Sequence, residues 1–283
     1  MFSSVKRLMA EGGFWGLLGL TLAGAITGCV QKPSPLPVAP AGPAAMASAS
    51  EDAAEPRDPA AVAELKRATD FLAALPRFHI RATVTYDAIQ EDGRRLQFEK
   101  FGDIYVQRPD RIFADIRLDD GRHRQLWYDG KTLSIAERSR NLHTQVKAPP
   151  TIDGMLDMAE ELFKDPMPLA DLLYDDLAPL DQRASEADVV GDSLVGGRPC
   201  RHLAFRGATV DWQLWVEQGD KPFIRKLVIS YREEPGTPQC VALLDFWETP
   251  ERFADGLFTF VVPQGSQWVK VLVTPPAGKG VQP

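Results

Sequence analysis

The sequence is poor in the residues from which metal and catalytic sites are usually built. It contains three cysteines and four histidines among 283 residues. No two histidines are separated by one or by three residues, a spacing that is typical of zinc ligands on a strand or a helix. We therefore predict no metal site and no cofactor, and we expect the histidines to have structural roles. They are His79, His123, His143 and His202.

A serine nucleophile has equally little support. Gly191-Asp192-Ser193-Leu194 spells the signature of one class of lipases and esterases, in which an Asp-x-x-His motif far downstream supplies the base. Here the last histidine is His202, and no aspartate stands three residues before it. A serine hydroxyl without a base is inert at neutral pH. We predict no catalytic residue and no enzymatic activity. A hydrolase ranks a distant third, after the two candidate functions given below.

Positive charge is also in short supply. The chain carries 32 Lys and Arg against 39 Asp and Glu, a net charge of −7. Nucleic-acid-binding proteins usually present a basic face, so we predict no nucleic-acid partner. The same balance argues against attachment to anionic lipid by charge, so membrane association must come from acyl chains.

The principal apolar run lies at the N-terminus and is too short to span a bilayer as a stable helix. Lys6 and Arg7 precede this run, which covers residues 14–27 and leads into Ile26-Thr27-Gly28-Cys29. This is the layout of a secretory signal. The last four residues resemble the bacterial lipobox, and the resemblance implies cleavage before Cys29 and acylation of Cys29. The alternative is an ordinary secretory peptide with an incidental cysteine.

The residue after Cys29 bears on the destination of a lipoprotein. Val30 stands there, and not the aspartate that commonly retains lipoproteins in the inner membrane. We therefore expect a protein of the bacterial cell envelope, bound to the membrane through its acyl anchor at the periplasmic face of the outer membrane.

Composition divides the chain into four parts. Residues 1–28 are predicted as a lipoprotein signal peptide. Residues 29–57 contain six prolines and no aromatic residue, which predicts a disordered Pro/Ala-rich linker. Residues 58–273 are long enough for one substantial core, and residues 274–283 are expected to be a disordered tail.

Apolar periodicity predicts a helix followed by strands. Asp58-Pro59 supplies an N-cap and a first-turn proline, apolar residues then recur at helical spacing, and Pro76 ends the run. From Phe78 the period changes to two, which is typical of a half-buried strand. Further strands are expected over residues 95–107, 112–118, 125–128, 132–136 and 142–146.

A helical insert then interrupts the strands. Thr151 caps a helix whose apolar stripe includes Leu156, Leu162 and Phe163, and Pro166 ends it. A short helix is expected over residues 168–174. Because the later connections are short, sequential strands should pair antiparallel. These strands are expected over residues 188–195, 200–205, 210–217, 224–231 and 240–247.

This order of elements predicts an α+β fold. About eleven strands in one meander would form a strongly curved antiparallel sheet, an incomplete β-barrel. The amphipathic helices need an apolar surface, so they should cover the concave face of that sheet.

The arrangement resembles the lipoprotein-carrier (LolA/LolB-like) fold in a strand break at Arg108-Pro109-Asp110 and in a hairpin over residues 129–133. Residues 60–262 also resemble a family of uncharacterised, predicted periplasmic proteins, domain of unknown function 2092. Four segments carry this second resemblance: Thr151-Ile152-Asp153, Pro168–Leu173, Pro199–Phe205 and Val210–Glu217.

The leading hypothesis is a non-enzymatic envelope lipoprotein that binds an apolar ligand in the concavity of a half-barrel. The carrier resemblance implies a lipid or the acyl chains of a lipoprotein as the ligand. The alternative is a periplasmic interaction or sensing module with a filled core; the oligomeric state is left open. The predicted lid or cavity residues are Leu156, Leu162, Phe163 and Trp212.

The chain has two further cysteines beside Cys29, and the oxidising periplasm favours a disulfide between them. The predicted meander places two strands between the strand of Cys200 and that of Cys240. Three strand spacings amount to about 14 Å, whereas a disulfide needs Cα atoms within about 7 Å. We therefore predict no disulfide.

Overall fold

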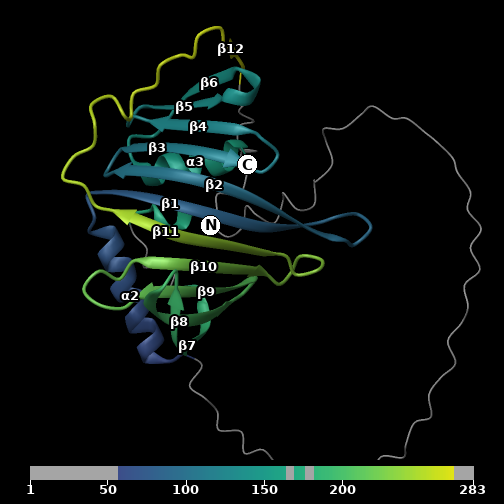
Figure 1. Ribbon diagram of the computed structural model, residues 1–283, viewed down its shortest axis with the longest axis vertical. Helices are drawn as coiled ribbons and strands as arrows, with labels where there is room; N and C mark the ends of the chain where they lie inside the picture. Colours follow the sequence, from purple (N-terminus) through teal and green to yellow (C-terminus); the bar gives the residue numbers. More distant parts are fainter. Residues whose placement is uncertain (1–56, 164–168, 176–181, 271–283) are drawn as a thin grey trace, which may run out of the picture. The chain divides into compact units, whose positions relative to one another are not determined.

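The computed structural model describes residues 57–163, 169–175 and 182–270 (Figure 1). Cys29, the predicted signal peptide, nearly all of the linker and the tail lie outside these residues, so the predicted domain boundaries stay predictions. Within the described ranges, no helix is long and apolar enough to cross a membrane.

The described residues build one open sheet of twelve strands in the order β12-β6-β5-β4-β3-β2-β1-β11-β10-β9-β8-β7 (Figure 1). The pairs are antiparallel except for the short contact between β12 and β6. The bounds are β1 Arg77–Ile89, β2 Arg95–Gln107, β3 Arg111–Leu118, β4 His123–Tyr128, β5 Thr132–Glu137, β6 Leu142–Lys147, β7 Ala184–Val195, β8 Arg198–Gly207, β9 Val210–Glu217, β10 Ile224–Tyr231, β11 Gln239–Glu248 and β12 Gln267–Trp268.

The predicted fold class is confirmed: the sheet is curved, open and mostly antiparallel. The prediction of a single continuous meander was wrong. The chain forms two meanders, β1–β6 and β7–β11, and they join where β1 pairs with β11 along Tyr86↔Cys240 to His79↔Glu248. The two strands that flank the helical insert, β6 and β7, therefore lie far apart in the sheet. The parallel strand β12 was not predicted either.

The first helix, α2 (Pro59–Ala73), begins where the sequence predicts. The carboxylate of Asp58 accepts a hydrogen bond from Ala60 N at 2.8 Å. The helix buries Leu65, Ala68 and Leu72 completely or nearly so, and it packs on β7, β8 and β9. Its apolar side thus covers the second meander.

The insert contains α3 (Ile152–Phe163) and a single 3-10 turn, η2 (Ala170–Leu172). The hydroxyl of Thr151 accepts a hydrogen bond from Gly154 N at 3.2 Å, as expected of a cap. The second predicted helix, over residues 168–174, is only this 3-10 turn, because so short a segment closes one turn at most.

The helices and both meanders share one hydrophobic core. Alternate residues of each strand point to the face that carries the helices, which we call the inner face; the opposite one is the outer face. Buried side chains of α2, α3 and every strand from β1 to β5 and β7 to β11 belong to one cluster. The sheet therefore encloses its helices from one side.

The structure leaves both described cysteines free and buried. Cys200 lies on β8 and Cys240 on β11, with β9 and β10 between them. Burial raises the pKa of Cys240 to about 12 and also raises the pKa of Cys200. Because the thiolate is the reactive form, neither thiol is expected to react in the folded protein.

Alkylation of the protein without reductant should therefore leave Cys200 and Cys240 unmodified in native buffer and modify both in urea. Intact-mass and peptide mass spectrometry measure the two sites separately. A species in urea that takes up label only after reduction would contradict the strand order as well as the free thiols.

Candidate functional site

The inner face is an apolar surface that spans both meanders. The first meander contributes residues such as Phe78, Ile80 and Val106, which are all fully buried. The second contributes Phe205 and Trp212, whose rings stack with centroids 5.3 Å apart. Such a surface suits an apolar ligand, because it offers aliphatic and aromatic contacts and little competing polarity.

Helix α3 lies on this surface by its apolar side. Ile152, Met155, Leu156 and Ala159 are each at most 4% exposed. They recur at helical spacing, so they form one stripe. The stripe belongs to the same cluster as the buried residues of the sheet.

Two points of the insert are held at one corner of the sheet, the β2–β3 turn. At the start of α3, Ile152 N donates to Pro109 O at 3.0 Å. After η2, the Arg108 guanidinium donates to Leu173 O at 2.9 Å and to Tyr174 O at 3.2 Å, and it pairs with the carboxylate of Asp175. We call this insert the flap; it is bonded to the β2–β3 corner, and its chain continues into β7 at the far edge of the sheet.

Arg108 is well placed to close this flap. Its side chain is 9% exposed and lies over the Phe78 ring at 5.6 Å. Hydrogen bonds from a charged donor contribute about 1.5–3 kcal/mol each. The sequence identifies Arg108 only as part of a strand break, because its partners lie more than 60 residues away.

The nearby hairpin supports the corner. The Asp129 carboxylate accepts hydrogen bonds from Lys131 N and Thr132 N. Gly130 has φ +87°, and a Cβ there would lie 2.8 Å from a carboxylate oxygen of Asp110. Only glycine fits this turn, so the hairpin can pack directly against the β2–β3 turn.

Polar contacts also tie the insert to itself. Tyr174 Oη donates to the Asp157 carboxylate at 2.9 Å, and Asp175 N donates to the Asp153 carboxylate at 3.0 Å. Burial, and then the hydrogen bond to Asp157, raises the pKa of Tyr174; burial also raises the pKa of Asp153. These groups hold η2 against α3.

One carboxylate of the insert is itself buried. Asp171 in η2 has a side chain that is 16% exposed, and Arg183 Nη1 lies 3.9 Å from Asp171 Oδ1. Burial raises the pKa of Asp171, although the charge of Arg183 acts in the opposite direction. Hydropathy patterns give no sign of this, because Asp171 falls in a short segment without clear periodicity.

The predicted site residues are brought together only in part. Leu156 is buried on the inner face and Leu162 is half-buried. Trp212 is buried in the second meander. The side chain of Phe163, like Cys29, lies outside the described part of the chain.

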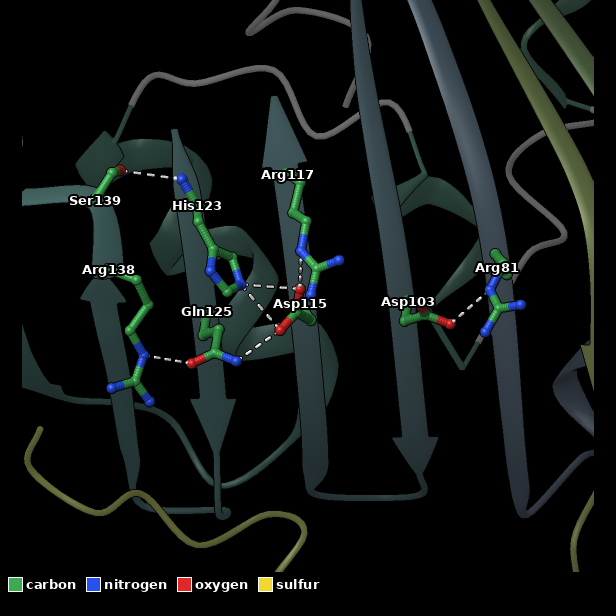
Figure 2. A network of polar contacts seen from close by, with 8 residues as sticks. All are labelled: Arg81, Asp103, Asp115, Arg117, His123, Gln125, Arg138 and Ser139. Carbon is green, nitrogen blue, oxygen red and sulfur yellow. Dashed lines mark hydrogen bonds and ion pairs between the residues drawn. The ribbon is translucent and has the colours of Figure 1, made fainter. Parts of the chain in front are cut away.

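A second cluster, of polar side chains, lies on the outer face (Figure 2). Asp103 and Asp115 stand directly opposite each other on β2 and β3. Like charges in such positions are destabilising, and cationic or donor groups offset them. Asp103 contacts Arg81 at 3.1 Å and His79 at 2.7 Å.

The second aspartate has its own partners. Asp115 contacts His123 Nε2 at 3.0 Å and Gln125 Nε2 at 2.6 Å, and Arg117 lies 3.5 Å away. In Figure 2 all these side chains come from neighbouring strands of the sheet. The imidazoles of His79 and His123, expected to be structural, each face a carboxylate, and Ser139 Oγ contacts only the backbone N of His123, from which it accepts a hydrogen bond at 3.1 Å. The cluster stabilises the sheet.

The segment that follows β11 covers the adjoining part of the outer face. His79, Tyr105, Phe113 and Trp127 form an aromatic row across β1–β4 with centroid distances of 4.0, 5.7 and 5.2 Å. Residues 249–270 pack along this row through the rings that contact Tyr105 and Trp127, and they end in β12 beside β6. These rings belong to Phe253 and Phe260.

Comparison with known proteins agrees with the sequence resemblance. The model of a family described as "Predicted periplasmic protein (DUF2092)" matches residues 61–272. No curated protein matches the chain.

Solved structures to which the chain is similar include one described as a lipoprotein. LppX of Mycobacterium tuberculosis is 12% identical, with 69% of this chain and 98% of that chain covered and a TM-score of 0.44. LprF of Mycobacterium bovis is 13% identical, with 75% and 99% covered and a TM-score of 0.45. A LolA superfamily protein of Nitrosomonas europaea is 9% identical, with 71% and 97% covered and a TM-score of 0.33.

Asp171 should make stability depend on pH in a defined direction. Because burial raises the pKa of Asp171 in the folded state, the folded protein keeps a proton that the unfolded chain releases above about pH 4. Stability from this group is present in acid and is lost as the pH rises through the raised pKa. Asp171→Asn should therefore raise the urea midpoint at pH 7 and flatten its change between pH 4 and 7.

Urea unfolding followed by tryptophan fluorescence at several pH values measures both effects. Asp255→Asn, at an exposed position, is the control and should leave the pH profile unchanged. A lower midpoint for Asp171→Asn at pH 7 would mean that the attraction of Arg183 outweighs the cost of burial.

Proposed function

This chain belongs to the DUF2092 family of predicted periplasmic proteins, and on that premise we propose that it is a non-enzymatic protein of the bacterial cell envelope that binds an apolar ligand on the inner face. The ligand class we propose is a lipid or the acyl chains of a lipoprotein. The observation that carries the proposal is the flap: α3 buries its apolar stripe on the inner face, and the start of α3 and the segment after η2 are tied to the β2–β3 corner.

This arrangement suits reversible covering of an apolar surface. Outward movement of α3 about the corner would expose the inner face while the start of the insert stays bonded to Pro109 O. An apolar chain that replaced the stripe of α3 would regain much of the burial that the opening loses, since burial is worth about 25 cal/mol per Å². The contacts of Arg108 favour the closed arrangement.

We propose further that Cys29 carries the acyl chains that anchor the protein, and that Leu156, Leu162, Phe163 and Trp212 line the ligand site or its lid. The outer membrane is the proposed destination. The hydrolase is not retained, because the Gly191–Leu194 signature lies within β7 and Ser193 stands opposite Cys200 rather than beside a histidine.

One observation favours a second candidate, an interaction module with a filled core. The buried side chains of the inner face, α2 and α3 form one continuous cluster in the described residues. If this cluster never opens, the ligand must be a protein that binds elsewhere.

Lipid binding distinguishes the two candidates. Native mass spectrometry of the full chain, followed by organic extraction, should find a co-purified lipid, and an apolar fluorescent probe should bind competitively with it. A probe that binds this protein no better than an unrelated periplasmic protein would remove the ligand-binding proposal.

The flap residues allow a sharper test. Leu156→Asp places an unpaired carboxylate on the inner face, and it should weaken probe binding about tenfold or more at a cost in stability of several kcal/mol. Arg108→Met removes the closing contacts, so probe association and dissociation should both become faster. Glu161→Lys, on the exposed side of α3, is the control for a change of charge. Binding and stopped-flow kinetics are compared only among variants with wild-type circular dichroism, and unchanged values for both variants would contradict the flap.

The anchor is tested separately. Cys29→Ser removes the sulfur that acylation requires, so the protein should leave the membrane fraction or stay uncleaved. Fractionation of cells with an immunoblot measures this. Recovery of the wild-type protein free in the periplasm would contradict the anchor and would leave the ligand proposal intact.

A further inference from the structure

The outer face carries an exposed apolar patch at the centre of the sheet. Leu243 and Phe246 of β11 are 41% and 40% exposed. Trp215 on β9 and Phe101 on β2 are half-buried on the same face. A solvent-exposed sheet face is usually polar, and a contiguous apolar patch marks an interaction surface more often than chance.

Cationic side chains accompany these rings in a regular pattern. One row across the sheet reads Trp215, Lys226, Leu243, Thr83, Phe101 and Arg117, on strands β9, β10, β11, β1, β2 and β3. Directly paired residues point to the same side of a sheet. The row therefore alternates aromatic and cationic groups on either side of the β11–β1 boundary.

The order of the groups is self-complementary: each cation on one side of that boundary has an aromatic ring at the same distance on the other side. Lys226 and Phe101 both lie one and a half strand spacings from it, about 7 Å, on opposite sides. Trp215 and Arg117 lie two and a half spacings away, about 12 Å. In each pair one member is a cation and the other an aromatic ring.

The neighbouring row also places a cation and an aromatic ring at equal distances from the β11–β1 boundary. Phe246 on β11 is paired with Arg81 on β1, half a spacing from the boundary on either side. The side chains of Arg81 and Arg117 are 44% and 64% exposed, so both can reach a partner.

From this pattern we infer that the outer face binds a second copy of this chain, with a two-fold axis that runs along the strands between β11 and β1. A two-fold interface brings each position against the position equidistant from the axis. Lys226 then faces Phe101 of the partner subunit, and Arg81 faces Phe246 of the partner subunit. Arg117 faces Trp215 of the partner subunit.

The contacts within one chain prepare these groups for such an interface. Lys226 Nζ lies 4.5 Å from the centre of the Trp215 ring, and the guanidinium of Arg81 lies 5.6 Å from that of Phe246. The Phe246 ring offers its second side to the partner's Arg81, whereas the Trp215 ring already stacks on the His202 ring, with centroids 3.9 Å apart. Arginine and aromatic residues are also the types enriched at protein interfaces.

Curvature limits the size of this contact. The inner face encloses the helices, so two outer faces meet only at their central strands. An interface of this size is weak and reversible, and it leaves both inner faces directed away from each other. The inference therefore does not depend on the proposed function.

Sedimentation velocity of the full chain in mild detergent, over a range of concentrations, tests the inference. The wild type should be a reversible dimer. Lys226→Glu and Phe101→Lys should each raise the dissociation constant about tenfold or more, because each change acts twice in a two-fold dimer. Arg94→Glu, in the β1–β2 turn with a side chain that is 72% exposed, is the matched control and should leave the constant unchanged.

The double variant Phe101→Lys with Lys226→Phe decides the geometry. It exchanges the two facing groups, so it should restore the dimer to within about threefold of wild type. Circular dichroism and thermal melting establish that every variant is folded. A wild type that stays monomeric to about 100 µM, a dimer that neither single variant weakens, or a double variant that stays monomeric would each overturn the inference.

Discussion

The pairing of β1 with β11 is the contact on which the rest of the structure depends. Each meander alone would expose an apolar face and a long unpaired edge. β1 pairs along its whole length with β2, and most of it also pairs with β11, a strand about 160 residues later. This single junction makes two half-sheets into one inner face and places Leu243 beside Thr83 on the outer face. Both candidate surfaces therefore exist only when the junction forms.

The two helices share the inner face, but they are attached to different halves of the sheet. Asp58 N, just before α2, donates to Ala187 O on β7, and Arg67 donates to Gly219 O after β9. The start of helix α3 is tied to Pro109 instead, and the segment after η2 is tied to Arg108. The two helices are therefore held on the inner face by separate sets of contacts.

The sequence could predict what is local. The alternation at Ile80, Ala82 and Val84 and the cap at Asp58 follow from the geometry of a strand or a helix, and the structure has both. The short connections also predict most strand pairs. The β1–β11 pair, the parallel β12 and the partners of Arg108 could not be predicted, because residues far apart in the sequence leave no periodic signal. The closing contact of the flap is of this kind, whereas its apolar stripe is not.

Two large apolar side chains on the outer face stay exposed, although their burial would be favourable. Leu243 and Phe246 remain 41% and 40% exposed although a threonine at either position would suit a solvated strand equally well. The aromatic row of β1–β4, by contrast, is covered by residues 249–270, so this chain does bury outer-face rings where it can. Residues 249–270 cover that row and not the central patch, in which aromatic and cationic side chains alternate. Exposed rings next to a covered row of rings are better explained by a partner than by incomplete folding, and the symmetry of the pattern about the β11–β1 boundary makes that partner the chain itself.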